Sequence, residues 1–151
     1  MGKLEQRVLV VDDDTAIRTL LMTIMRRRGL TADAACDGAE ALERLNRCHY
    51  ALVLLDLMMP RQSGWDVLGE VARWPLERRP LIIVLTAGSE PRALDSTLVA
   101  ATVRKPFDIE MLVDTVTACV RRQSGREQLD DCPNADTEAV KKVTPSRQNV
   151  N

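Results

Sequence analysis

The sequence predicts a single α/β domain in which helices cover both faces of a five-stranded parallel sheet. Short apolar runs alternate with segments of helical period along the first 122 residues, as in consecutive β–α–β units. Two of these runs, Ala51–Leu55 and Leu81–Leu85, are apolar at every position, which is typical of strands buried on both faces. The 151 residues are 45% hydrophobic and 28% charged, a composition that suits one globular domain with its own core.

The first half of the chain predicts two strands and two helices. Arg7–Val11 is the first strand, and Gly29 ends the helix that follows it. That helix has apolar residues at the i, i+3, i+4, i+7 spacing, namely Ile17, Leu20, Leu21 and Ile24. Thr31–Cys36 predicts a second strand, although alanine is a poor strand former. Asp37 caps a second helix, which runs through Arg47.

The second half predicts three strands and three helices. The two fully apolar runs are the third and fourth strands, and Val99–Val103 is the fifth. A helix over Gly64–Trp74 joins the third strand to the fourth, and a shorter one over about Pro91–Leu98 leads to the fifth. The last helix begins near Asp108 and turns one apolar face inward, formed by Ile109, Leu112, Val113, Val116 and Val120.

The chain changes character after Arg122. Residues 124–151 are polar, have no aromatic residue and show no sustained period, so they bury too little apolar surface to offset the entropy of ordering. We therefore expect an ordered domain over residues 1–123 and a disordered tail over 124–151. The tail is too short and too polar to form a DNA-binding winged helix.

Composition and charge exclude several classes of protein. The 21 basic residues balance 22 acidic ones, which argues against direct nucleic-acid or membrane binding. The longest apolar run, Tyr50–Leu55, is too short to cross a bilayer, and the first residues have no signal-peptide pattern, so we expect a cytoplasmic protein. Four scattered cysteines and a single histidine also argue against a zinc cage.

Polar residues follow four of the five predicted strands. They are Asp12, Asp13 and Asp14 after the first strand, Asp56 after the third, Thr86 after the fourth and Lys105 after the fifth. The carboxyl ends of parallel strands meet at one edge of a sheet, where open α/β folds bind their ligands. We therefore expect these side chains to share one pocket.

The charges of that pocket predict a metal ion. Two carboxylates about 4 Å apart repel each other by roughly 4 kcal/mol at an effective dielectric near 20. Asp12, Asp13 and Asp56 with Lys105 carry a net charge of −2, which one divalent cation neutralises. An all-oxygen set of carboxylates suits Mg²⁺, which also keeps waters and phosphate oxygens as ligands.

Four motifs in this order, VLVVDDD, LVLLDLMMPRQSGWDVL, IIVLTA and VRKPF, resemble the response-regulator receiver domains of two-component systems over about residues 7–122. The resemblance implies a stand-alone receiver with a flavodoxin-like (βα)5 fold and strand order 2-1-3-4-5. It implies phosphorelay signalling by protein–protein contact, with a histidine kinase or histidine phosphotransfer protein as the phosphoryl donor. Such a domain catalyses only its own phosphorylation and slow dephosphorylation.

The resemblance also implies a role for each site residue. Asp56 takes the phosphoryl group, and Thr86 and Lys105 contact its oxygens. Asp13, Asp56 and the backbone carbonyl of Met58 bind Mg²⁺ directly, and Asp12 binds it through water. The Lys105–Pro106 bond resembles the family's cis peptide.

The sequence departs from the family at three positions. Thr102 stands where the family usually has an aromatic switch residue, three positions before the active-site lysine. Met58 and Gly88 stand where relatives carry side chains that tune dephosphorylation, and neither can position a hydrolytic water. Because Thr102 is too small to act as the aromatic switch does, we expect phosphorylation to change the face formed by the fourth helix, fifth strand and fifth helix less than is usual.

Other interpretations stay open at this point. Asp12–Asp14 taken alone could simply cap a helix. A haloacid-dehalogenase-type phosphatase would need Thr or Val at Ala16, and a P-loop would need Lys at Glu70. A receiver-like binding module that works without phosphorylation is a further alternative. Ile17 matches an apolar position that contacts the phosphodonor partner in receivers, but it could equally be a core residue.

Overall fold

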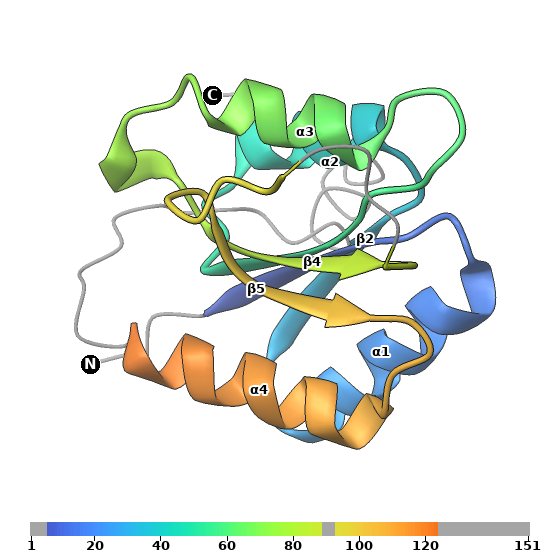
Figure 1. Cartoon of the computed structure of the whole chain (residues 1–151). Coiled ribbons are helices and arrows are strands. Elements are labelled where there is room, and N and C mark those ends of the chain that lie inside the picture. Colours follow the sequence, from blue (N-terminus) through green and yellow to red (C-terminus); the bar gives the residue numbers. More distant parts are fainter. Residues whose placement is uncertain (1–5, 89–92, 124–151) are drawn as a thin grey trace, which may run out of the picture.

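The computed structural model describes residues 6–88 and 93–123, which form one parallel sheet with helices on both faces (Figure 1). The strands are β1 (Arg7–Val11), β2 (Thr31–Ala35), β3 (Leu52–Asp56), β4 (Leu81–Thr86) and β5 (Val99–Arg104). Their order is β2-β1-β3-β4-β5, which confirms the predicted doubly wound topology. The order reverses between β1 and β3, so the ligand edge predicted from the sequence lies beside these two strands.

Two helices cover each face of the sheet. The helices are α1 (Thr15–Arg27), α2 (Gly38–Arg47), α3 (Gly64–Val71) and α4 (Ile109–Arg122), with a short 3₁₀ turn, η1, over Leu76–Arg78. In Figure 1, α1 and α4 lie below the sheet, and α2 and α3 lie above it. Aspartates at the N-caps of α1, α2 and α4 accept hydrogen bonds from first-turn amides, and Ser63 forms a capping box with Asp66 at α3.

The core consists of two apolar clusters, one on each side of the sheet. Alternate residues of each strand point to opposite faces, so that β1 gives Leu9 and Val11 to the α2–α3 side and Val8 and Val10 to the α1–α4 side. Every residue of β1 and β3 is buried, as expected for central strands covered on both faces. Among the described residues, no helix has the length and apolar character needed to span a membrane.

One predicted helix is absent from the described residues. The helix expected over about Pro91–Leu98 is not formed at residues 93–98, where the chain makes a turn before β5; residues 91 and 92 lie outside the described part. The carboxylate of Asp95 accepts hydrogen bonds from the amide and the hydroxyl of Thr97, at 2.8 and 2.6 Å. Such a local side-chain cap offers the backbone an alternative to helical hydrogen bonds.

Several predicted boundaries shift by a few residues. The strands β3, β4 and β5 each run one residue further than expected, so that Asp56 and Thr86 are the last residues of their strands. Helix α3 ends at Val71 and not at Trp74, because Pro75 disfavours the helical conformation at the residue before it. In α1, Leu20 belonged to the predicted apolar face but is exposed. The buried face of this helix is centred on Leu21 and Met25. The predicted tail, residues 124–151, lies outside the described residues.

Candidate functional site

Three of the strands bring their carboxyl-terminal residues to one edge of the sheet. Asp12 directly follows β1, Asp56 ends β3 and Thr86 ends β4, and all three side chains are buried. The strands align so that Asp56 pairs with Leu85 and Thr86 pairs with Arg104 at the end of β5. Lys105 follows at once, and this order of strand ends is the one that the sequence predicted.

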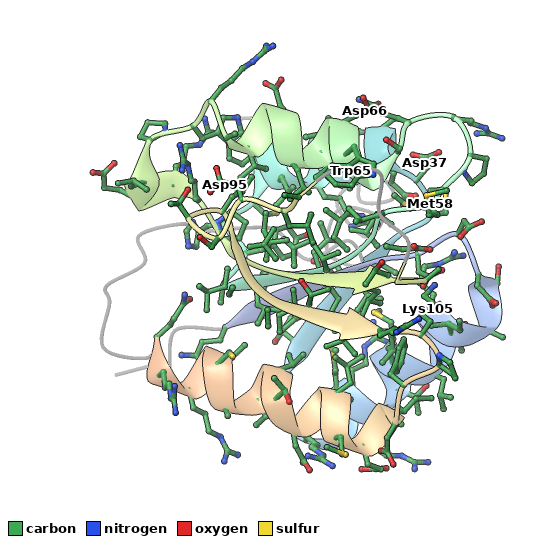
Figure 2. All side chains as sticks on the ribbon, viewed as in Figure 1. Asp37, Met58, Trp65, Asp66, Asp95 and Lys105 are labelled. Carbon is green, nitrogen blue, oxygen red and sulfur yellow. The ribbon has the colours of Figure 1, made fainter. Side chains whose placement is uncertain are left out.

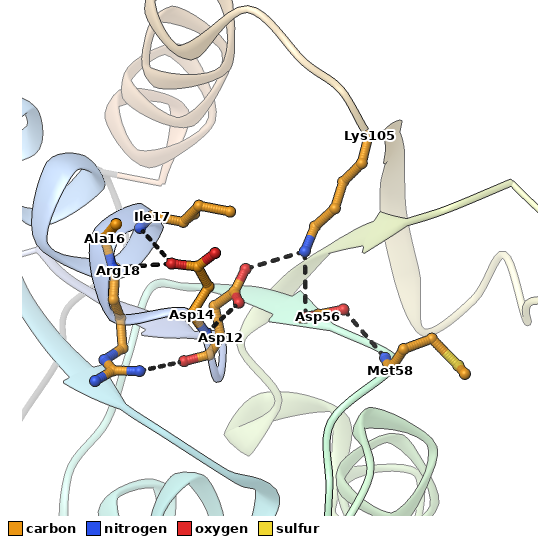
Figure 3. Close-up of polar contacts among 8 residues, drawn as sticks. All are labelled: Asp12, Asp14, Ala16, Ile17, Arg18, Asp56, Met58 and Lys105. Atoms are coloured by element: carbon orange, nitrogen blue, oxygen red, sulfur yellow. Dashed lines mark hydrogen bonds and ion pairs between the residues drawn. The ribbon is translucent and has the colours of Figure 1, made fainter.

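Lys105 links two of the strand ends by its charge. Its Nζ atom lies 3.2 Å from Asp12 Oδ2 and 3.2 Å from Asp56 Oδ2 (Figure 3). Partial burial lowers the pKa of Lys105, but the charges of Asp56 and Asp12 outweigh this effect, so that its pKa is raised overall. The ammonium group therefore stays charged and holds the two carboxylates together.

Asp13 completes an acidic cluster at the mouth of the site. Its side chain is exposed, and one carboxylate oxygen from each of Asp12, Asp13 and Asp56 lies within 4.8 Å of the others. No other group of three or more potential metal ligands of this kind is found in residues 6–88 and 93–123. Three carboxylates around one point, with a single ammonium to compensate them, fit a hard divalent cation such as Mg²⁺.

Both carboxylate oxygens of Asp56 are engaged in the folded chain. Its Oδ1 accepts a hydrogen bond from the Met58 amide at 3.1 Å, and its Oδ2 faces Lys105. Burial is the main cause that raises the pKa of Asp56, with the Asp12 charge adding to it, while the Met58 amide and Lys105 act in the opposite direction. A buried carboxylate that repels a neighbour is stabilised by added positive charge.

The loop after β1 is fixed by hydrogen bonds that the sequence does not reveal. Asp12 Oδ1 accepts from the Asp14 amide at 2.9 Å, and the Asp14 carboxylate caps α1. Arg18 donates from its guanidinium to the backbone carbonyl of Asp12 at 2.7 Å (Figure 3). Arg18 is one turn into α1, so its side chain can reach back over the loop. The helix-cap interpretation thus holds for Asp14, while Asp12 and Asp13 belong to the acidic cluster.

Gly64 holds the loop after β3 against the site. A Cβ atom at this position would come within 2.7 Å of the Leu57 Cα, and the Gly64 amide donates to the Leu57 carbonyl at 3.2 Å. The start of α3 therefore lies directly on the backbone that carries Asp56. Met58, which lies between Leu57 and Gly64 in the sequence, has an exposed side chain, and its amide donates to Asp56 (Figure 3). Its predicted carbonyl–metal contact stays a prediction.

Thr86 and the bond after Lys105 complete the site. Thr86 Oγ1 accepts a hydrogen bond from the Gly88 amide at 3.0 Å, which leaves the hydroxyl proton available to a ligand. The Lys105 amide donates to the Thr86 carbonyl at 2.7 Å, and the Lys105–Pro106 bond is cis, as the sequence predicted. Two buried acid groups, a buried hydroxyl and an ammonium group thus lie at one edge of the sheet.

Two of the residues singled out from the sequence lie outside this group of polar side chains. Ile17, in the first turn of α1, is half-buried and packs against the apolar cluster on the α1–α4 side. This contact covers part of the Ile17 side chain, and the rest stays accessible to solvent. Thr102 lies in β5 opposite Val84, and its side chain is exposed.

Comparison with known proteins agrees with this geometry. The family model described as "Response regulator receiver domain" matches residues 8–117. The transcriptional regulatory protein CpxR homolog of Haemophilus influenzae is 34% identical over 120 residues, which cover 78% of this chain and 52% of that relative. The chain spans between about half and 63% of the length of the curated relatives that it matches.

Solved structures with the same fold include receiver domains. A CheY-like response regulator receiver domain protein from Methanospirillum hungatei is 32% identical with a TM-score of 0.69, covering 80% of this chain and 100% of that one. The response regulator protein TrrA from Thermotoga maritima, in complex with Mg²⁺–BeF, is 37% identical with a TM-score of 0.65, covering 76% of this chain and 98% of that one.

Proposed function

Because the chain belongs to the response regulator receiver domain family, we propose that it is a signalling switch that accepts a phosphoryl group on Asp56. The observation that carries this proposal is the position of Asp56, which ends a buried strand and faces Asp12 and Lys105. The donor is a histidine kinase or a histidine phosphotransfer protein, and the signal passes on through a cytoplasmic protein partner. The domain acts only on itself, through its own phosphorylation and slow dephosphorylation.

The transfer step makes one bond and breaks one bond. A carboxylate oxygen of Asp56 bonds to the phosphorus of a phosphohistidine, and the phosphorus–nitrogen bond breaks. The bonding pair leaves with the imidazole ring, which takes up a proton from the solvent. The product is an acyl phosphate on Asp56, whose oxygens can accept hydrogen bonds from the Lys105 ammonium and the Thr86 hydroxyl.

The acidic cluster fits Mg²⁺ as the cofactor of this reaction. The ligands that we assign are Asp13, Asp56 and the carbonyl of Met58, with Asp12 acting through water. When bound, Mg²⁺ neutralises charge on the phosphoryl oxygens. Phosphorylation replaces one negative charge on Asp56 by about two, which a site already carrying −2 would otherwise resist. The TrrA complex with Mg²⁺–BeF supports this assignment by similarity.

Labelling by a small phosphodonor tests the proposal. We expect acetyl phosphate with Mg²⁺ to add one phosphoryl group to the wild-type chain, and we expect no addition to Asp56→Asn, because the amide is not a nucleophile here. Intact-mass measurement detects the change. Asp66→Asn is the matched control, since Asp66 is exposed and engaged in the capping box of α3. Absence of labelling in the wild type would favour a binding module that works without phosphorylation.

Ile17 is proposed as part of the surface that meets the phosphodonor protein. It lies three residues after Asp14, at the end of α1 that borders the acidic cluster (Figure 3). Ile17→Ala should slow phosphotransfer from the cognate donor while labelling by acetyl phosphate stays the same, because only the protein donor needs this surface. A marked fall in thermal stability would instead assign Ile17 to the core.

A further inference from the structure

Arg104 lies beside the site on the face of the sheet opposite to Lys105. It is the last residue of β5 and is in register with Thr86, the last residue of β4. Registered residues on neighbouring parallel strands, which lie about 4.8 Å apart, point to the same face, and the next residue along points to the other. Arg104 and Thr86 are therefore neighbours on the α2–α3 side.

The guanidinium group of Arg104 lies against the backbone of Gly88. A Cβ atom at Gly88 would lie 2.7 Å from Arg104 Cζ and 2.9 Å from its Nη2, so the guanidinium lies in close contact with this residue. Gly88 also has a φ of +91°, a conformation that favours glycine. The backbone conformation of the turn after β4 thus favours glycine, and the Arg104 guanidinium packs closely on it.

Gly88 in turn orients Thr86. Its amide donates the 3.0 Å hydrogen bond to Thr86 Oγ1, so the hydroxyl uses one lone pair here and keeps its proton free. Arg104 forms no ion pair with any carboxylate of residues 6–88 and 93–123. Its contact with Gly88 is therefore not a by-product of a salt bridge in this part of the chain.

We propose that Arg104 is a positioning residue for Thr86. Its guanidinium restrains the Gly88 amide, the amide orients the Thr86 hydroxyl, and the hydroxyl is then ready to donate to the phosphoryl group. The inference rests on the proposed function of Asp56 and Thr86, and it gives a role to Arg104, which lies in the VRKPF motif but had no role in the sequence analysis.

The contact itself can be tested in the unmodified protein. We expect the Gly88 amide proton to exchange with solvent at least about fivefold faster in Arg104→Met than in wild type, because the restraint on its hydrogen bond is lost. Arg27→Met is the matched control: it removes another exposed arginine, at the end of α1, and should leave this exchange rate unchanged. An unchanged rate in Arg104→Met would overturn the proposal.

A double-mutant cycle tests the route through Thr86. Arg104→Met should slow labelling by acetyl phosphate about three- to tenfold in the wild-type background, and less than about twofold in the Thr86→Ala background. Equal slowing in both backgrounds would show that Arg104 acts on the phosphodonor directly. Arg104→Lys keeps the charge and lacks the planar group, so full recovery of the rate by lysine would also overturn the proposal.

The two proposals fail in different ways. If wild-type Asp56 accepts no phosphoryl group, the proposed function is wrong, while the exchange rate of the Gly88 amide still decides whether Arg104 restrains this turn. If Asp56 is labelled and the cycle is additive, the proposed function stands and the positioning role of Arg104 does not.

Discussion

Asp12, Asp13 and Asp14 are neighbours in the sequence, yet their side chains have three different surroundings. Asp12 is fully buried and pairs with Lys105, Asp13 is exposed within the acidic cluster, and Asp14 caps α1. The chain turns from strand to helix at these residues, so successive side chains point in unrelated directions. The residue pattern placed all three after the first strand without separating them, because identical residues carry no distinguishing signal, and only the resemblance to receivers gave Asp12 and Asp13 different roles.

This division predicts different effects on metal binding. Asp13→Asn removes one of three carboxylates in the cluster, and we expect Mg²⁺ to bind at least about tenfold more weakly, as measured by calorimetry. Asp14→Ser is the control, because serine keeps the helix cap and removes a charge that lies outside the cluster. Equal losses of affinity in the two variants would contradict the assignment of Asp13.

The sequence analysis did not find a second set of buried polar side chains, which lies away from the acidic cluster. The hydroxyl of Tyr50 donates to Asp33 Oδ2 at 2.8 Å, and Arg7 lies 3.4 Å from the same oxygen. Each residue begins or lies within an apolar segment, and no motif connects them. Only the pairing of β1 with β2 brings Arg7 and Asp33 to the same face.

Loss of the Tyr50 hydroxyl should reduce stability. Tyr50→Phe leaves a buried carboxylate with one hydrogen-bond donor fewer, and we expect the free energy of unfolding in urea to fall by about 1–3 kcal/mol. Thr117→Val is the control, since the Thr117 hydroxyl donates to the Val113 carbonyl within α4, where the backbone hydrogen bond remains. A Tyr50→Phe protein as stable as wild type would show that water replaces the phenol.

The same group predicts how stability depends on pH. Burial, and then the hydrogen bond to Asp33, raise the pKa of Tyr50 far above its ordinary value near 10. The folded state therefore keeps a proton that the unfolded chain releases, so this stabilisation is complete below about pH 10 and is lost as the pH rises further. Between about pH 10 and 12, urea unfolding of wild type should lose up to about 1.4 kcal/mol per pH unit more than Tyr50→Phe does. Parallel curves would contradict this.

At the scale of elements, the apolar strands were predicted to within one residue, whereas the helix predicted over about Pro91–Leu98 is not formed at residues 93–98. Periodicity identifies a strand or helix when burial dominates its energy, as in β3 and β4. Of the described residues 93–98 before β5, Leu94 and Leu98 pack against the apolar core. There the hydrogen bonds of Asp95 with Thr97 decide the conformation, and such local competition is hard to weigh from composition.

Helix α3 offers a test with two glycines in one element. Gly64→Ala should lower the free energy of unfolding by about 1–3 kcal/mol, because its Cβ would overlap the backbone of Leu57. Gly69→Ala should raise it by about 0.5–1 kcal/mol, since nothing lies within 4 Å and alanine favours the helix. Denaturant unfolding measures both. Effects of the same sign would mean that the loop after β3 moves away to accept a side chain at Gly64.

At the scale of the whole molecule, the polar site lies at one end of the sheet. Lys105 and Met58 lie together at one end of the sheet, and Asp95 lies at the other (Figure 2). The parallel direction of the strands followed from the alternating pattern and their order from the resemblance to receivers, and the two together suffice to gather Asp12, Asp56, Thr86 and Lys105 at one edge. The contacts that refine the site, from Arg18 and Arg104, depend on side-chain directions that the pattern does not contain.

The distribution of core residues predicts that the domain folds without the last 28 residues. Both apolar clusters are built from described residues between Val8 and Val120, and α4 closes the α1–α4 side with four of them. A chain that ends after Gln123 should therefore keep its free energy of unfolding within about 0.5 kcal/mol of the full-length value. Its labelling by acetyl phosphate should also be unchanged, because every residue of the proposed site is retained. Urea unfolding and intact-mass labelling of both chains measure these two quantities. A loss of stability of several kcal/mol would mean that residues 124–151 pack on the domain, and a loss of labelling alone would place part of the tail at the site.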